Sequence, residues 1–308
     1  MPADAAIQNV LSVRARLGEG PLWDAERQVL HWVDIYNRRV HTFDPATAVD
    51  TFIELDTLVS GLFLGDRDHL IVAQENGLGQ LNLPTEQVTP IMPIEAHLPN
   101  NRLNDGRCDD RGRLWIGTMN NDEQPLANLY RYDRDGTLQQ MATGLSIANG
   151  LGWSPDRSRF YLTDTPRQTI YVYHFEAESG AISDRRPFID LTDEPFYPDG
   201  LTVDAEGCLW SAMWNGSCVI RFDPHGQVMQ RIPLPVPLVT ACTFGGPHLT
   251  DLYITTASAG MSQGELKQYY QAGDLFCLPT DIQGLPSDRC AQFPSLPKAA
   301  SSSANDQS

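Results

Sequence analysis

A small residue followed by a short apolar stretch recurs six times along this chain of 308 residues, at intervals of 41 to 50 residues. The six segments begin at Gly20, Gly61, Gly106, Gly150, Gly200 and Ala241. After each start come a turn rich in Asp, Gly, Pro or Arg and a second apolar run, and several copies add a third run that ends in an aromatic residue and Asp. Short runs rich in Val, Ile, Tyr, Phe and Trp between turn residues predict β-strands, and no helical periodicity competes with them.

A period of this length with about four strands per unit is typical of propeller blades. Six repeats predict an all-β fold, a six-bladed β-propeller with four-stranded antiparallel blades around a central channel. We expect a single domain over residues 1–292, in which the segment 7–17 adds a strand to the last blade and closes the ring. The stretch from Ala299 to the end is polar and of low complexity, and we expect residues 293–308 to be a disordered tail. An irregular pair of β-sandwiches is the alternative interpretation of the same strands.

The residue directly before each of the six starts is polar. These residues are Glu19, Ser60, Asp105, Asn149, Asp199 and Thr240. The first strand of each propeller blade runs along the channel, so equivalent positions at its start should form a ring around one mouth. Carboxylates that converge in a narrow channel repel one another unless a cation or protons intervene. Oxygen ligands favour Ca²⁺, Mg²⁺ or Mn²⁺, whereas the alternative interpretation is that Asn-Gly and Asp-Gly are turn dipeptides chosen for their backbone.

A second polar cluster precedes Asp105. Arg102 and Asn104 are two residues apart and therefore lie on the same side of an extended segment. Together they offer donors and acceptors that suit a ligand rich in hydroxyl groups or bearing a carboxylate, although an Arg near acids can also serve only to balance charge. A later loop should add Asp122 and Glu123 on the same face, but that charge run alone is typical of a solvated turn.

The charge of the chain excludes some partners. With 39 acidic and 22 basic residues the net charge is −17, which disfavours nucleic acid and anionic membranes as partners. The N-terminus lacks a secretory leader and no run of eighteen apolar residues occurs, so we expect a cytoplasmic protein. The sequence leaves the oligomeric state open, with a monomer favoured. Six cysteines without a C-x-x-C pair are interpreted as small buried hydrophobic residues rather than disulfides or zinc ligands.

Five motifs over nearly the whole chain resemble the family of senescence marker protein, gluconolactonase and luciferin-regenerating enzyme, six-bladed propellers that include regucalcin. The motifs are LGEGPLWD at 17–24, NRLNDGRCDDRGRLWIGTM at 101–119, SIANGLGWSPD at 146–156, YPDGLTVDAEGCLW at 197–210 and CTFGGPHLTDLYITTA at 242–257. The resemblance implies one divalent cation held by Glu19, Asn149 and Asp199. Ca²⁺ is the first expectation for such oxygen ligands, with Zn²⁺, Mn²⁺ or Mg²⁺ as alternatives.

The same resemblance implies that Arg102 and Asn104 contact a sugar. A Glu of the family that also contacts substrate corresponds to Asp122, which keeps the charge but has a shorter side chain. The implied activity is hydrolysis of a small-molecule sugar lactone, similar to gluconolactone, to the aldonic acid. In this interpretation the metal polarises the ester carbonyl and Asp199 activates water.

Two alternatives to a lactonase remain at this point, and one other catalytic mechanism is disfavoured. An organophosphate hydrolase or another ester hydrolase of the same propeller type would use the same metal. A non-catalytic calcium-binding regulator would bind the ion without chemistry. Catalysis by Ser, His and Asp is disfavoured because the seven His residues fall in or beside strands and turns of different blades.

Overall fold

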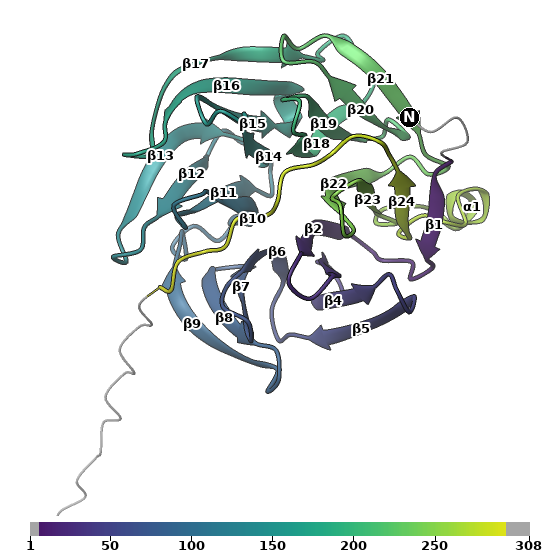
Figure 1. Cartoon of the computed structure of the whole chain (residues 1–308), viewed down its shortest axis with the longest axis horizontal. Helices are drawn as coiled ribbons and strands as arrows, with labels where there is room; N and C mark the ends of the chain where they lie inside the picture. The colour runs from purple at the N-terminus through teal and green to yellow at the C-terminus, as the bar shows by residue number, and fades with distance from the viewer. Residues whose placement is uncertain (1–5, 294–308) are drawn as a thin grey trace, which may run out of the picture.

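The computed structural model describes residues 6–293 and consists of six four-stranded antiparallel sheets arranged in a ring (Figure 1). Each sheet is built from strands that follow one another along the chain, except that the last sheet also takes in the N-terminal strand. Each sequence repeat is therefore one blade. The fold class predicted from the spacing, a six-bladed β-propeller, is confirmed.

The first three blades follow the first three repeats. Blade 1 contains β2 (Gly18–Asp24), β3 (Val29–Asp34), β4 (Arg39–Asp44) and β5 (Val49–Glu54). Blade 2 contains β6 (Val59–Leu64), β7 (His69–Gln74), β8 (Gly77–Asn82) and β9 (Gln87–Pro93). Blade 3 contains β10 (Asn101–Cys108), β11 (Leu114–Asn120), β12 (Ala127–Tyr132) and β13 (Leu138–Leu145).

The last three blades include two short helical segments. Blade 4 contains β14 (Ala148–Trp153), β15 (Arg159–Asp164), the 3₁₀ turn η1 (Thr165–Arg167), β16 (Thr169–Glu176) and β17 (Ala181–Asp190). Blade 5 contains β18 (Tyr197–Val203), β19 (Leu209–Trp214), β20 (Cys218–Phe222) and β21 (Val228–Pro233). Blade 6 contains β22 (Val239–Gly245), β23 (Asp251–Thr256), α1 (Gln263–Gln268) and β24 (Leu275–Pro279), with β1 (Gln8–Leu11) at its outer edge. Within residues 6–293, no helix combines the length and the apolar character needed to span a membrane.

The ring is closed by pairing the two ends of the propeller. β1 lies antiparallel to β24, with Gln8 opposite Cys277 and Asn9 opposite Phe276. The segment 7–17, expected to add a closing strand, thus supplies β1 and then leads into β2. The end of the predicted tail, residues 294–308, lies outside the described residues.

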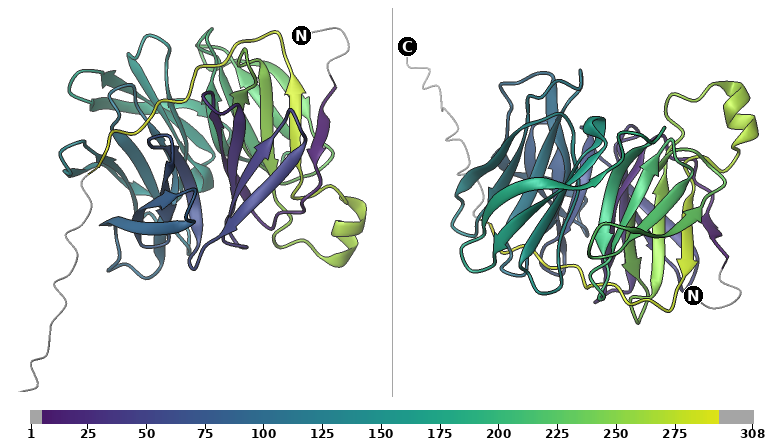
Figure 2. Two further views of the ribbon diagram at one scale, coloured as in Figure 1. Left: turned by 60° about the horizontal axis from the view of Figure 1, so that its bottom comes forward. Right: turned by 90° about the horizontal axis from the view of Figure 1, so that it is seen from above.

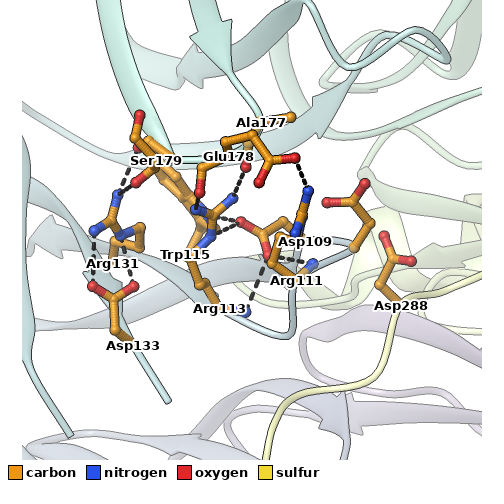
Figure 3. A network of polar contacts seen from close by, with 12 residues as sticks. Asp109, Arg111, Arg113, Trp115, Arg131, Asp133, Ala177, Glu178, Ser179 and Asp288 are labelled. Carbon is orange, nitrogen blue, oxygen red and sulfur yellow. Dashed lines mark hydrogen bonds and ion pairs between the residues drawn. The ribbon is translucent and has the colours of Figure 1, made fainter. Parts of the chain in front are cut away.

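Polar networks link neighbouring blades. In Figure 3, the buried Asp109 carboxylate accepts hydrogen bonds from Arg113 Nε (2.6 Å) and Trp115 Nε1 (2.9 Å). Arg113 and Arg131 of blade 3 then donate to backbone carbonyls of the β16–β17 turn in blade 4. Because each guanidinium is satisfied by acceptors from two blades, these contacts fix the two blades relative to one another.

A C-terminal strap, defined as residues 280–293, crosses one face of the ring after β24 (Figure 1). Figure 2 shows this strap on one face of the disc and α1 beyond the opposite face. Along its path the strap pairs with blade 5 through Gly284, binds Arg157 of blade 4 through Asp288 (2.8 Å), and donates to blade 2 through Cys290 N (2.8 Å). The strap therefore supplies a second closure in addition to β1.

The strap also corrects the expectation for the cysteines. Cys290 forms a disulfide with Cys108 of blade 3, at a sequence separation of 182 residues. Cys208, Cys218, Cys242 and Cys277 are buried free thiols, as expected for all six. The expectation was wrong for the disulfide pair because only the course of the strap brings Cys290 back to blade 3.

Candidate functional site

The inner strands of all six blades carry a β-bulge at the same register. The bulges lie at or beside Glu19, Ser60, Asp105, Asn149, Asp199 and Thr240. A bulge re-aims side chains and bends the strand, so it turns these residues toward the mouth of the channel. Small residues follow them because the inner strands approach closely: a Cβ on Gly150 would lie 2.4 Å from Asp199 O.

Two members of the ring have a structural role. Thr240 Oγ1 donates to Gly18 O at 2.6 Å and thereby joins blade 6 to blade 1. Ser60 Oγ donates to Ala73 O within blade 2 at 3.4 Å. Their hydroxyl groups satisfy backbone carbonyls, so the ligand-binding capacity of the ring lies in blades 1, 3, 4 and 5.

The acids of the ring disfavour one another's ionised forms. Burial, followed by the negative charge of Asp105, raises the pKa of Glu19 from 4.5 to about 8. Burial and the charges of Glu19 and Asp105 raise the pKa of Asp199 well above its usual range. The Asn149 amide donates to Asp199 Oδ1, which is the contact that joins blades 4 and 5 at this level. A divalent cation among these oxygen-bearing side chains would relieve the repulsion, so the donor set fits a hard cation.

A cavity of about 460 Å³ opens directly above this part of the ring. Its lining residues are Leu17, Glu19, Ile35, Tyr36, Arg102, Asn104, Met119, Glu123, Ile147, Asn149, Thr165, Pro166, Tyr197, Asp199 and Trp214. The structure thus brings six of the residues named in the sequence to one cavity: Glu19, Arg102, Asn104, Glu123, Asn149 and Asp199. Its size lies within the range of ordinary small-molecule sites.

The blade 3 wall of the cavity is polar. Arg102 Nη1 donates to Leu103 O (2.9 Å) and to Asn104 Oδ1 (3.0 Å), while Asn104 Nδ2 donates to Ala148 O (3.0 Å). Asn104 therefore holds the guanidinium in place and links blade 3 to blade 4. Arg102 Nη2 makes no hydrogen bond to any residue between 6 and 293, so this donor is available to a ligand in the cavity.

The structure separates the two acids of the loop after β11. Asp122 accepts a hydrogen bond from Asn100 Nδ2 at 2.7 Å and lines a neighbouring groove with Leu98 and Leu126. Glu123 instead lines the cavity. The predicted contact of Asp122 with substrate remains a prediction, and Glu123 is the acid of this loop that lines the same cavity as Arg102.

An aromatic wall, formed by Tyr36, Tyr197 and Trp214, faces the cavity from blades 1 and 5. Tyr197 and Trp214 are cross-strand partners in β18 and β19. We did not single out these residues in the sequence. Tyr197 could have been predicted from the sequence, because it precedes Asp199 by two positions and alternate residues of a strand point to the same side.

Asp105 lines a different space from Glu19 and Asp199. Together with Arg107, it lines a small enclosed space of about 40 Å³ between the ring and the strap, where Asp288 forms part of the far side. This space is large enough for water. The strap therefore closes the channel behind the ring, and the cavity is the open approach to Glu19 and Asp199.

A separate acidic group occurs in blade 5. Asp204, Glu206 and Cys208 bring potential ligand atoms within 4.8 Å of one another. However, Arg221 Nη2 donates to both carboxylates, at 2.7 Å to Asp204 and 2.5 Å to Glu206. The charge of this group is already compensated by a guanidinium, in the same way as that of Asp109 in blade 3.

Comparison with known proteins adds relatives of similar length. The chain is 38% identical over 274 residues to a Bacillus subtilis protein named as a candidate sugar lactone lactonase, YvrE, covering 88% of this chain and 94% of that protein. It is 35% identical over 289 residues to pentonolactonase XacC of Haloferax volcanii, covering 92% and 97% of the two chains. The crystal structure of a calcium-binding protein, regucalcin, from Agrobacterium tumefaciens superimposes with a TM-score of 0.90 at 28% identity, covering 94% and 98%.

The family model that describes the SMP-30/gluconolactonase/LRE-like region matches residues 17–258, from the strand that carries Glu19 to the end of β23. This match spans most of the propeller and includes all six positions of the ring. The chain is therefore a member of the SMP-30/gluconolactonase/LRE-like family.

Proposed function

We propose that this protein is a metal-dependent sugar lactonase that hydrolyses an aldonolactone similar to gluconolactone to the aldonic acid. The observation that carries this proposal is the convergence of Glu19, Asn149 and Asp199 beneath a cavity whose blade 3 wall presents Arg102. The relatives named for lactone hydrolysis support the same class of reaction.

Glu19, Asn149 and Asp199 would hold one divalent cation through oxygen atoms. Ca²⁺ suits an all-oxygen donor set best, and Zn²⁺, Mn²⁺ and Mg²⁺ are the alternatives that the experiment below distinguishes. When bound, the cation supplies Lewis acidity toward the carbonyl oxygen of the lactone.

Asp199 acts as the general base in this proposal. Its carboxylate takes a proton from the attacking water while the water oxygen bonds to the carbonyl carbon. The bond between the carbonyl carbon and the ring oxygen then breaks, and the ring oxygen takes up the proton to become a hydroxyl group. Water and lactone are thereby converted to the open aldonic acid, and Asp199 returns to its ionised form.

The blade 3 wall positions the substrate. Arg102 donates hydrogen bonds to lactone oxygens, and Asn104 keeps the guanidinium in place. We assign to Glu123 the hydroxyl-binding role that the family resemblance gives to Asp122, because Glu123 lines the cavity and the Asp122 carboxylate is bonded to Asn100. Holding the lactone ring in one orientation above Asp199 lowers the entropic part of the activation barrier and therefore increases the rate of hydrolysis.

The test is hydrolysis of a panel of five- and six-membered aldonolactones by chelated protein, before and after addition of Ca²⁺, Zn²⁺, Mn²⁺ or Mg²⁺. We expect chelation to abolish hydrolysis and one of the ions to restore it. A fluorophosphate ester with a higher kcat/KM than every lactone would replace the proposal with an organophosphate hydrolase. Ion binding without hydrolysis of any ester would favour a non-catalytic calcium-binding regulator; the Agrobacterium structure is described as that of a calcium-binding protein.

A further inference from the structure

The turn after β11 is held by a buried amide rather than by its own exposed side chains. Asn120 is 2% exposed, and its Oδ1 accepts hydrogen bonds from the backbone N–H groups of Asp122 and Gln124, both at 3.1 Å. The Asn120 carbonyl oxygen also accepts from Glu123 N at 2.9 Å. Three consecutive N–H groups of the turn are therefore bound by one residue.

These bonds decide the direction of the side chains in the turn. Asp122 and Gln124 line the neighbouring groove, while Glu123 between them lines the cavity. Glu123 has a left-handed backbone, with φ of 55°, which a residue with a side chain adopts only when its surroundings enforce it. The paired bonds from Asn120 to the residues on either side supply that constraint.

The Asn120 side chain is itself held in place by other polar side chains. Its Nδ2 donates to Asn101 Oδ1 at 2.8 Å, and Asn101 Nδ2 donates to the buried Glu95 carboxylate at 2.7 Å. Asn101 of β10 is the cross-strand partner of Asn120 of β11, and Arg102 directly follows Asn101 in the sequence. A chain of satisfied buried polar groups thus connects the strand that carries Arg102 to the turn that carries Glu123.

We propose that Asn120 is a positioning residue for substrate: its side chain sets the turn so that Glu123, and not Asp122, reaches the lactone beside Arg102. This inference rests on the proposed lactonase function. Arg102 and Glu123 then offer a hydrogen-bond donor and an acceptor to hydroxyl groups of one substrate, with Asn120 setting the direction of the Glu123 side chain. The substrate class that this pair suits is an uncharged polyhydroxy lactone.

A double-mutant cycle between Asn120→Ala and Glu123→Gln tests this proposal. We expect each single substitution to raise KM by roughly tenfold or more, the loss typical of a hydrogen bond to a charged group, with kcat changed less than about twofold. The double variant should show little further increase, because Asn120 acts through Glu123. Isothermal titration should give the same metal affinity in all variants, since Glu19, Asn149 and Asp199 are untouched.

Asn101→Ala is the matched control. It removes the partner of Asn120 Nδ2 and leaves both acceptor contacts to the turn, so it should lower the melting temperature while KM stays within about threefold of wild type. If Asn120→Ala does not fold, Asn120→Ser replaces it in the cycle, because the shorter hydroxyl reaches at most one of the two amides.

The outcomes separate this inference from the proposed function. Wild-type protein that hydrolyses no lactone overturns the proposed function and the inference with it. An active wild type in which the KM effects of Asn120→Ala and Glu123→Gln multiply overturns the inference alone. So does an active wild type in which Asp122→Asn raises KM as much as Glu123→Gln.

Discussion

Replacing Glu19 with Gln should stabilise the metal-free protein and remove its metal binding. Without a cation, burial and the charge of Asp105 raise the pKa of Glu19 from 4.5 to about 8. At pH 7 the folded chain therefore keeps this carboxyl group protonated, whereas the unfolded chain ionises it. At about 1.4 kcal/mol per pKa unit, the gap between 4.5 and pH 7 lowers the stability of the folded state by about 3 kcal/mol.

The sign of the pH dependence follows from the raised pKa. This loss of folding stability is small below pH 4.5, where the Glu19 carboxyl group is protonated in both the folded and the unfolded state. It grows as the pH rises and levels off above about pH 8, where the group is ionised in both states. Gln keeps the shape of the side chain without a proton to lose. The stability advantage of Glu19→Gln should therefore grow from about 1 kcal/mol at pH 5 to about 3 kcal/mol at pH 7.

Urea unfolding in the presence of a chelator, followed by tryptophan fluorescence at pH 5 and pH 7, measures this difference. Glu86→Gln is the control, because Glu86 is exposed and its neutralisation should change stability little at either pH. The reasoning is refuted if Glu19→Gln is no more stable than wild type at pH 7. It is also refuted if its advantage is the same at both pH values, since an uncharged packing effect does not depend on pH.

Three further outcomes are expected. Arg102→Ala should raise KM for the lactone by roughly tenfold or more and leave the metal dissociation constant unchanged, as kinetics and calorimetry can show; an unchanged KM would remove Arg102 from substrate binding. Reduction of the Cys108–Cys290 disulfide should lower the free energy of unfolding by up to about 5 kcal/mol for a loop of this length, and Cys290→Ser should make stability insensitive to reductant. Metal affinity should rise by at least about tenfold per pH unit below pH 8, because Glu19 releases a proton on binding and Asp199, whose pKa is also raised, can release a second; a flat calorimetric profile from pH 6 to 8 would contradict this.

The fold was predictable because its determinants are local and repeated. Alternating apolar residues and turn residues define each strand, and the period sets the number of blades. The ring positions followed from the same repeat, because each precedes a small residue that the close approach of inner strands requires. The shared register placed Glu19, Asn149 and Asp199 in one ring with Ser60, Asp105 and Thr240, and the family resemblance then singled out these three.

Other features depend on the paths of segments that do not repeat. The disulfide needs the strap to carry Cys290 back to Cys108, and nothing in their spacing encodes that path. The choice between Asp122 and Glu123 depends on two hydrogen bonds from one buried amide, because a shift of one residue reverses the direction of a side chain. The aromatic wall was missed since Trp214 comes from the end of a second strand rather than from the ring.

The most direct test of the account is lactone hydrolysis titrated with a divalent cation, with bound metal measured on the same samples. We predict that hydrolysis by chelated wild-type protein rises in proportion to bound metal and saturates at about one ion per chain, the stoichiometry of a single site. Asp199→Ala should bind metal weakly and remain inactive at every metal concentration. Full hydrolysis by the chelated wild type, or by Asp199→Ala, would contradict the account.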